Sequence, residues 1–309
     1  MNTDRPPDGL WSVVRVVSLC LGFMVICQWA AAQVSPTDSL YRQEIDFGQY
    51  LLNSQQYDDA ALVFAKLDTA TVGQLDKSQA DSLHFLNGWA YYNLKQLLPS
   101  SEQFLQVSGN STKYHASRFF AAYQLTYKEY YPQAAGVLND LYLGEDSLLA
   151  ELRSLQLSGN VLLHRNYKEF EKHANGFTYS YYQLQKEEEN LQKAYHQLMK
   201  VKRRSPFVAG LLSAVVPGLG KVYAGKPKQG IASFFPIALL GAQAFENIHK
   251  RGIKNGFSIF YTGLFSVFYI GNIWGSALSV QIKQQERYHE IDHHILFDLH
   301  IPLRNVFGN

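Results

Sequence analysis

The sequence is poor in cysteine and carries little net charge. Its 309 residues include two cysteines, Cys20 and Cys27, and both lie in an N-terminal apolar stretch. The rest of the chain therefore offers no disulfide framework, no thiolate metal site and no nucleophilic thiol. The net charge is +2. Nucleic-acid-binding proteins usually carry a strong basic excess on one domain, so the composition argues against a nucleic acid as partner.

Charge is also missing from two long C-terminal stretches. Ser205 to Gly220 has no charged residue over sixteen positions, and Asn255 to Ile282 has none over twenty-eight. The second stretch is long enough to span a membrane with some tilt. The first, as a helix, would be about 24 Å long, shorter than a hydrocarbon core of about 30 Å, and Pro217 breaks it. We therefore predict a membrane module over residues 205–282, made of a short inserted helix and a helical hairpin.

Residues 1–32 have the composition of a secretory signal peptide. Arg5 and Arg15 provide a positive region, Val16 to Ile26 an apolar region, and Ala30 to Ala32 a cleavage site of small residues. An uncleaved anchor is the alternative. Either segment would direct the chain to a membrane.

Residues 38–176 show the pattern of paired amphipathic helices, with apolar residues at spacings of three and four. Phe104 and Leu138 are thirty-four residues apart, which is the tetratricopeptide period, and an insertion separates Phe64 from Phe104. We therefore predict an all-α, tetratricopeptide-like helical solenoid. Its recurring positions are Gly48, Leu51, Ala60 and Phe64, then Gly88, Tyr91, Ser100 and Phe104, then Ala122, Leu125, Ala134 and Leu138, with a degenerate fourth unit around Gly159, Leu162, Tyr167 and Phe170.

Stacked helix pairs of this kind form an extended groove that binds peptides or proteins. Most of the recurring residues have a simple role in core packing. Four side chains are candidates for the groove instead: Tyr92, Tyr123, Lys128 and Tyr130.

A charged linker helix is expected over residues 177–204. Lys186 to Glu189 faces Lys193 at helical spacing, which stabilises a solvated helix modestly. The segment ends in the basic run Lys200 to Arg204, directly before the membrane module. Such a cluster suits anionic lipid headgroups.

The most specific signal is a glycine-rich run after the short apolar helix. A phosphate-binding loop is one interpretation, because Gly220 to Lys226 has the spacing G-x-x-x-x-G-K. That loop needs a strand before it and a hydroxyl residue after it, whereas an apolar helix precedes and Pro227 follows. A tight turn in a membrane hairpin explains the run better. Its residues are Pro217, Gly218, Gly220, Tyr223, Gly225 and Gly230.

This run resembles the TM2-type membrane module. More closely, Ser205 to Gly225 resembles the C-terminal part of Gram-negative envelope proteins that join tetratricopeptide-like repeats to such a module. In that family the run SP-x-x-A-G-x-L-S-x-x-x-P-G-x-G-x-x-Y-x-G is typical, and the sequence matches it. The resemblance covers Ser205 to about Gly275 and, loosely, the repeats. It implies residence in a membrane, and it implies no chemistry and no cofactor.

Residues 283–309 are expected to form a polar tail beyond the membrane. They contain His289-Glu290-Ile-Asp292-His293, which on a helix places two imidazoles on one face beside a glutamate, as in zinc peptidases. Asp292 argues against this interpretation, because zinc-peptidase helices usually carry an uncharged residue there. The residues left to supply a third ligand are His294, Asp298 and His300.

The function we expect is a scaffold without catalysis and without a cofactor, anchored in the lipid bilayer of a bacterial inner membrane, that binds envelope proteins or peptides. A zinc metallopeptidase using His289, Glu290 and His293 is the alternative. Transport by an oligomer of the hairpins is a weaker third class, because residues 255–282 carry no ionisable side chain for a transport path.

The side of the membrane is predicted in two ways. The signal peptide places the repeats in the periplasm. The positive-inside rule favours cytoplasmic repeats, because residues 200–228 are rich in basic side chains while Lys250, Arg251 and Lys254 are the basic residues of the opposite turn. We expect periplasmic repeats, because the cleavage site is the more specific of the two signals.

Overall fold

The structure is a computed structural model that describes residues 36–71 and 73–308. The signal peptide predicted at 1–32, with Cys20 and Cys27, lies outside these residues. Every regular element in the described part is an α-helix, which confirms the predicted all-α class. The chain divides into two compact units, Met1–Val137 and Leu138–Asn309.

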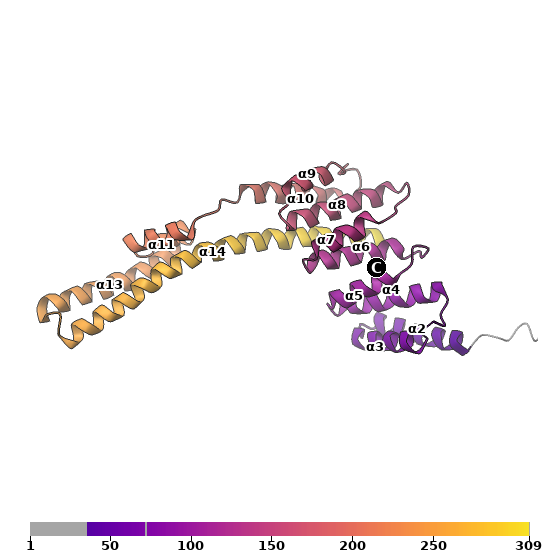
Figure 1. Ribbon diagram of the computed structural model, residues 1–309, viewed down its shortest axis with the longest axis horizontal. Helices are drawn as coiled ribbons and strands as arrows, with labels where there is room; N and C mark the ends of the chain where they lie inside the picture. Colours follow the sequence, from indigo (N-terminus) through magenta and orange to yellow (C-terminus); the bar gives the residue numbers. More distant parts are fainter. Residues whose placement is uncertain (1–35, 72, 309) are drawn as a thin grey trace, which may run out of the picture. The chain divides into compact units, whose positions relative to one another are not determined.

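In the first unit, consecutive helices pack against one another along the chain (Figure 1). The core between them is built from fully buried side chains such as Phe64, Leu67, Leu83 and Phe104. These helices are α2 (Pro36–Asn53), α3 (Tyr57–Ala70), α4 (Lys77–Asn93), α5 (Leu97–Gln106) and α6 (Tyr114–Tyr127), followed by α7 (Tyr131–Asn139), which crosses the division between the units.

Small residues let α4 and α5 approach closely. A Cβ atom on Gly88 would lie 2.8 Å from Cδ1 of Phe104, so only glycine fits beside this ring. The hydroxyl of Ser100 on α5 donates to the carbonyl of Gly88 at 2.6 Å and accepts from Nε2 of Gln124 at 2.9 Å. Ser100 thus fills the small-residue position predicted for it and also satisfies a buried carbonyl.

One turn geometry recurs between paired helices. After α2, α4, α6 and α8 (Ser147–Leu163), one residue takes positive φ: Gln55, Lys95, Glu129 and Arg165. The amide after each of them donates to a carbonyl five residues back, at 2.9, 3.0, 2.9 and 2.8 Å. This bond pattern ends a helix and reverses the chain within three residues. The fourth turn belongs to the repeat that was expected to be degenerate, and it has the same geometry as the other three.

The second unit begins with α8, α9 (Tyr167–Ala174) and α10 (Gln185–Lys200). The single charged linker helix expected over 177–204 differs from what is observed. Residues 175–184 form a loop, and 201–205 are also outside any helix. The helix between them is not a solvated linker, because Leu191, Ala194 and Leu198 form a buried stripe and the helix packs against α8 and α14.

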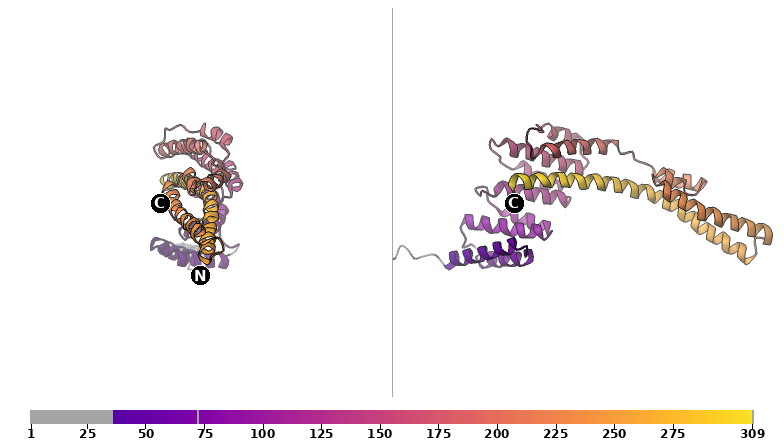
Figure 2. Two further views of the ribbon diagram at one scale, coloured as in Figure 1. Left: turned by 90° about the vertical axis from the view of Figure 1, so that its left-hand side faces the viewer. Right: turned by 180° about the vertical axis from the view of Figure 1, so that it is seen from behind.

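The C-terminal helices are α11 (Pro206–Val215), α12 (Leu219–Tyr223), α13 (Pro227–Arg251) and α14 (Gly256–Phe307). Two of them, α13 and α14, are long and apolar enough to cross a membrane, and 11% of the apolar window of each is buried inside the protein. They run side by side from the turn that joins them (Figures 1 and 2). The large apolar side chains on their surfaces include Phe235, Leu239, Phe245, Ile259, Phe260, Val267 and Trp274.

Residues 283–307 form the second half of α14, where a polar tail was expected. This half packs against α8 and α10, and Figure 2 shows it running beside them. Ile295, Leu299 and Leu303 recur at a spacing of four and are completely buried. This apolar stripe is the physical reason that the segment forms a packed helix.

Three contacts fix this half of α14 on α8 and the turn that follows it. Gly159 leaves space for Leu299: a Cβ atom at Gly159 would lie 2.5 Å from Cδ2 of that leucine. Nε2 of Gln156 donates to the carbonyl of Leu299 at 2.6 Å. In the turn after α8, the Arg165 guanidinium forms two hydrogen bonds with the Asp292 carboxylate, at 2.8 and 2.7 Å.

Buried carboxylates lie where the loop 175–184 crosses α8 and α10. Glu151 accepts from the amide and the hydroxyl of Thr178, at 3.0 and 2.6 Å. Glu188 is fully buried and accepts from the amide of Tyr179 at 3.1 Å. The pKa of Glu188 is raised to about 8, chiefly by burial and in addition by neighbouring Glu151. Glu188 therefore holds its proton at neutral pH.

This raised pKa makes folding stability depend on pH. The folded chain holds the Glu188 proton up to about pH 8, whereas the unfolded chain loses it near the ordinary value of 4.5. Stability from this group is complete at low pH and is lost as the pH rises across that window. Glu188→Gln keeps the shape and the hydrogen bonds but cannot ionise. We expect its melting temperature to fall less between pH 4.5 and pH 8 than that of the wild type.

The matched control is Glu189→Gln, which changes a half-exposed neighbour paired with Lys193. Its melting temperature, followed by circular dichroism, should keep the wild-type dependence on pH. The pKa values of Glu187 and Asp298 are also raised by burial, so a reduced rather than a zero slope is expected for Glu188→Gln. Equal slopes in the wild type and Glu188→Gln would contradict the assignment of a buried proton to Glu188.

Candidate functional site

The predicted groove side chains are the first set of candidate residues. They lie in two separate places. Tyr92 stacks on Trp89, with ring centroids 5.1 Å apart, and meets the edge of Phe120 at 5.6 Å. Tyr123 is buried, at 7% exposed, and its burial raises the pKa of its hydroxyl, with Tyr92 and Tyr127 adding to the effect. Tyr92 and Tyr123 therefore belong to one aromatic cluster, in which Tyr123 is a core residue.

The other two groove candidates lie in the turn after α6. Lys128 caps the helix, and Tyr130 is 44% exposed. Tyr127, which the sequence analysis passed over, is 48% exposed, and its ring lies 6.3 Å from that of Tyr123. Its spacing of four from Tyr123 was the available signal. Tyr127, Lys128 and Tyr130 are therefore exposed together at this turn.

The glycine-rich run forms the second candidate site, and the structure brings its members together. Gly218 has φ +84°, in the left-handed region, and a Cβ atom there would overlap the carbonyl of Gly230. In the reverse direction, a Cβ atom on Gly230 would lie 2.7 Å from the carbonyl of Gly218. The turn after α11 and the start of α13 therefore touch backbone to backbone. Pro217 follows the C-cap of α11, where no further helical amide is needed.

Gly220 anchors the turn to α11 and α14 through two serines. Its amide donates to Oγ of Ser213 at 2.9 Å, and the Ser213 hydroxyl donates to Oγ of Ser276 at 2.7 Å. Both serines are completely buried. A Cβ atom on Gly220 would overlap the backbone carbonyl of Ala209. Ser213 is the serine of the L-S-x-x-x-P-G part of the run quoted above, whereas Ser276, a lone serine in an apolar helix, gives no local signal.

Tyr223 joins the turn to the segment before the module. Its hydroxyl accepts from the amide of Ser205 at 3.3 Å. The Arg204 guanidinium lies 5.5 Å from the centre of the Tyr223 ring and donates to the Tyr223 carbonyl. Gly225 then takes φ +86° before α13 begins. Helix α11, rather than a strand, precedes this run, so the phosphate-binding-loop interpretation lacks its structural context.

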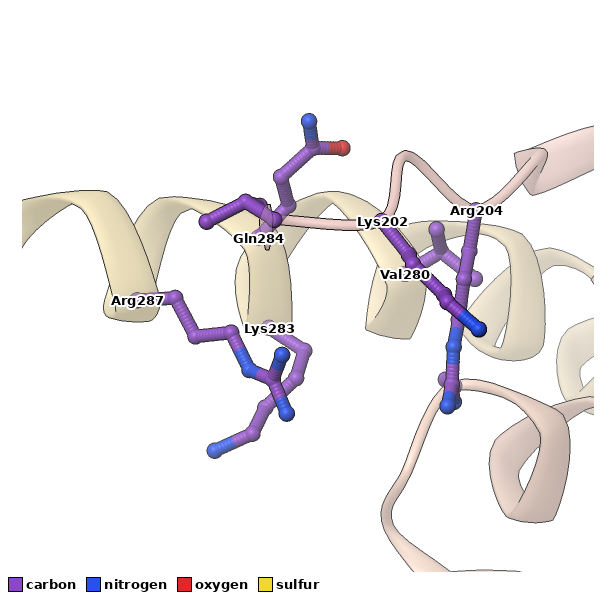
Figure 3. Close-up of a pocket in the computed structure, with 8 residues that line it drawn as sticks. Lys202, Arg204, Val280, Lys283, Gln284 and Arg287 are labelled. Atoms are coloured by element: carbon purple, nitrogen blue, oxygen red, sulfur yellow. The ribbon is translucent and has the colours of Figure 1, made fainter. Parts of the chain in front are cut away.

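Basic side chains gather beside this turn. A small pocket is lined by Lys202 and Arg204 of the linker and by Lys283 and Arg287 of α14 (Figure 3). Glu286 forms ion pairs with Lys226 at 3.0 Å and with Lys283 at 3.2 Å. The basic run that ends at Arg204 was expected from the sequence, whereas the contribution of α14 was not.

The His289-Glu290-x-x-His293 string lies on the exposed side of α14. Asp292, which fits a zinc-peptidase helix poorly, is the partner of Arg165 and points toward α8. Across residues 36–71 and 73–308, no three His, Cys, Asp or Glu side chains gather in a way that could hold a metal ion. Of this string, Asp292 therefore has a structural role in the docking of α14.

The packing of Gly220 leads to a prediction. Gly220→Ala would push a methyl group into the Ala209 carbonyl, which belongs to the backbone and cannot rotate away. We expect the module to lose about 3 kcal/mol of stability or more, measured by thermal unfolding of the detergent-solubilised protein.

The matched control is Gly263→Ala on α14, where a Cβ atom meets nothing within 4 Å. It should be neutral or stabilise the helix by up to about 1 kcal/mol. A similar loss in both variants, or none in either, would contradict the close approach of α12 to α11. A Cβ atom on Gly271 would likewise meet nothing within 4 Å, whereas one on Gly275 would lie 3.8 Å from Cε of Lys221.

Comparisons with known proteins give no family. No protein-family model, no curated protein and no solved structure matches the chain. The two sites described above therefore carry the functional argument: the exposed aromatic set at the turn after α6, and the glycine-serine turn with its basic surroundings.

Proposed function

We propose that this chain is a membrane-anchored scaffold of the bacterial cell envelope, whose tetratricopeptide-like repeats bind proteins or peptides without catalysis. The observation that carries this proposal is the division of α14. Its first half exposes large apolar side chains, and its second half is packed into the helices α8 and α10. One helix of 52 residues, about 78 Å long, thereby joins an apolar module (α11 to α13 and the first half of α14) to a helical array (α8 and α10).

Membrane residence is supported by how little of the apolar surface of α13 and α14 the rest of the protein covers. A core helix of a soluble protein is mostly buried, whereas 11% of the apolar window of α13 or of α14 is buried here. Side chains such as Phe235 and Trp274 are 66% and 70% exposed. Exposed apolar surface on this scale is typical of membrane or protein interfaces. The hydrocarbon core of a bilayer supplies the missing cover.

The repeat interpretation is supported by the recurring turn. Gln55, Lys95, Glu129 and Arg165 share one backbone conformation and one hydrogen-bond pattern. Repeats of paired helices stack into a solenoid with an extended binding surface. The exposed Tyr127 and Tyr130 are well suited to such a surface, because aromatic side chains bury much apolar area at low entropic cost. The partner class is an extended peptide or a helix of an envelope protein.

We place the repeats in the periplasm, on the basis of the predicted signal peptide. The distribution of basic residues favours cytoplasmic repeats instead, because Lys283 and Arg287 add to the basic residues of 200–228 on the side of the helical array. An impermeant maleimide distinguishes the two topologies. Thr112→Cys in the exposed loop before α6 should be labelled in intact spheroplasts, whereas cytoplasmic repeats would require lysis first.

Site-specific photocrosslinking tests the binding function. A photoreactive phenylalanine analogue at Tyr130, in the full-length protein in living cells, should give one discrete crosslinked envelope protein. The same analogue at Tyr182, which is 93% exposed but lies outside the candidate set, should not give it. Tyr127→Ala should reduce the crosslink at Tyr130 severalfold, because it removes neighbouring apolar contact area. Identical products at Tyr130 and Tyr182, or none at Tyr130, would contradict the proposed groove.

A further inference from the structure

The pocket beside the glycine-serine turn collects positive charge from segments far apart in the sequence. Lys202 and Arg204 come from the extended linker, and Lys283 and Arg287 lie one turn apart on α14. Figure 3 shows Lys283 and Arg287 extending from α14, and Lys202 and Arg204 reaching across it from the linker. Val280 and Ala224, each 2% exposed, form an apolar floor. No carboxylate is among the residues that line the pocket.

Folding therefore brings four cationic side chains to a pocket that no carboxylate lines. Glu286 is occupied by Lys226 and Lys283. Lys202 and Arg287 form no ion pair within the part of the chain that the structure describes. Like charges that share a site repel one another, and an anion between them would remove the repulsion. Arg and Lys together suit a phosphate group, which the planar guanidinium binds through two parallel hydrogen bonds.

The position of the pocket indicates the source of the phosphate. The apolar surface of α14 ends at Ile282, which is 47% exposed, and Lys283 follows directly. The apolar surface of α11 begins at Phe207, which is 77% exposed, three residues after Arg204. The four cations thus lie where both helices change from apolar to polar. In a membrane this level is the headgroup layer, where a basic side chain contributes about 1 kcal/mol toward anionic lipid.

We propose that Lys202, Arg204, Lys283 and Arg287 form a binding site for a phosphate group, supplied by an anionic phospholipid headgroup. This proposal rests on the membrane residence proposed above. Arg204 is held in place by the Tyr223 ring and carbonyl, so the glycine-serine turn positions one wall of the site. The other wall, Lys283 and Arg287, belongs to the helix that continues to α8 and α10. A bound headgroup would link the linker to α14 at the membrane surface.

Native mass spectrometry of the full-length, detergent-solubilised protein tests the site. The probes are phosphatidylglycerol and phosphatidylcholine with identical acyl chains, and inorganic phosphate. The wild type should bind phosphatidylglycerol in preference to phosphatidylcholine. The double variant Lys202→Gln/Arg287→Gln should bind phosphatidylglycerol about ten- to thirtyfold more weakly, as expected for two lost cations. Neither residue supports an ion pair in the described chain, so the fold should persist.

The matched control is Lys228→Gln, which removes one exposed lysine of α13 outside the pocket and should leave the preference unchanged. Equal binding of both lipids by the wild type, or unchanged phosphatidylglycerol binding by the double variant, would overturn the proposal. Binding of inorganic phosphate that displaces phosphatidylglycerol and is lost in the double variant would overturn the lipid source while keeping the phosphate site.

Co-flotation with vesicles of pure phosphatidylcholine separates this proposal from membrane residence itself. Protein that floats with these vesicles yet shows no preference for phosphatidylglycerol overturns the pocket proposal alone. Protein that does not float overturns the membrane anchor and, with it, the assignment of the phosphate to a lipid.

Discussion

The fit of Leu299 into the space left by Gly159 is the contact on which the second unit depends. It is completely buried, and the hydrogen bond from Gln156 to the Leu299 carbonyl and the ion pair of Arg165 with Asp292 surround it. A glycine inside a helix normally costs stability, so its presence in α8 needs a packing reason. The reason is the second half of α14, which could not come this close to a residue with a side chain.

Close approach of backbones also determines the packing of the turn between α11 and α13. Gly218 touches Gly230, and Gly220 touches Ala209, so the turn between α11 and α13 leaves no room for side chains. The Ser213 hydroxyl accepts from the buried amide of Gly220 and donates in turn to Ser276. Because α14 carries Ser276 and Lys283 as well as Leu299, one helix positions the turn, the basic pocket and the docking contact. The unit is therefore organised around a single long element.

The sequence predicted what depends on local pattern. Periodicity identified the helices, and the spacing of Pro217, Gly218, Gly220 and Gly230 identified a turn that the structure does build as a close approach. It did not predict contacts that join distant positions. No residue near Gly159 in the sequence indicates its contact with Leu299. Asp292 fits a zinc-peptidase helix poorly, and the sequence alone does not identify Arg165 as its partner.

Some of the missed features did leave a signal. Ile295, Leu299 and Leu303 have the spacing of a buried helix face, so the supposed polar tail carried the pattern of a packed helix. The loop at 175–184 begins with Asn175-Gly176, which is a turn signal. The burial of Tyr123 left no signal, because it results from how neighbouring helices meet. Side-chain burial on a helix that is covered on several sides cannot be inferred from the periodicity of that helix alone.

The most direct test of this account is a double-mutant cycle at the docking contact, measured as the free energy of unfolding of the full chain. Gly159→Ala should cost about 1–3 kcal/mol in the wild type, because its methyl group overlaps Leu299. In a Leu299→Ala background the same substitution should be neutral or stabilise α8 by up to about 1 kcal/mol. An equal cost of Gly159→Ala in both backgrounds would contradict the docking of α14, and with it the single helix that joins the apolar module to the helical array.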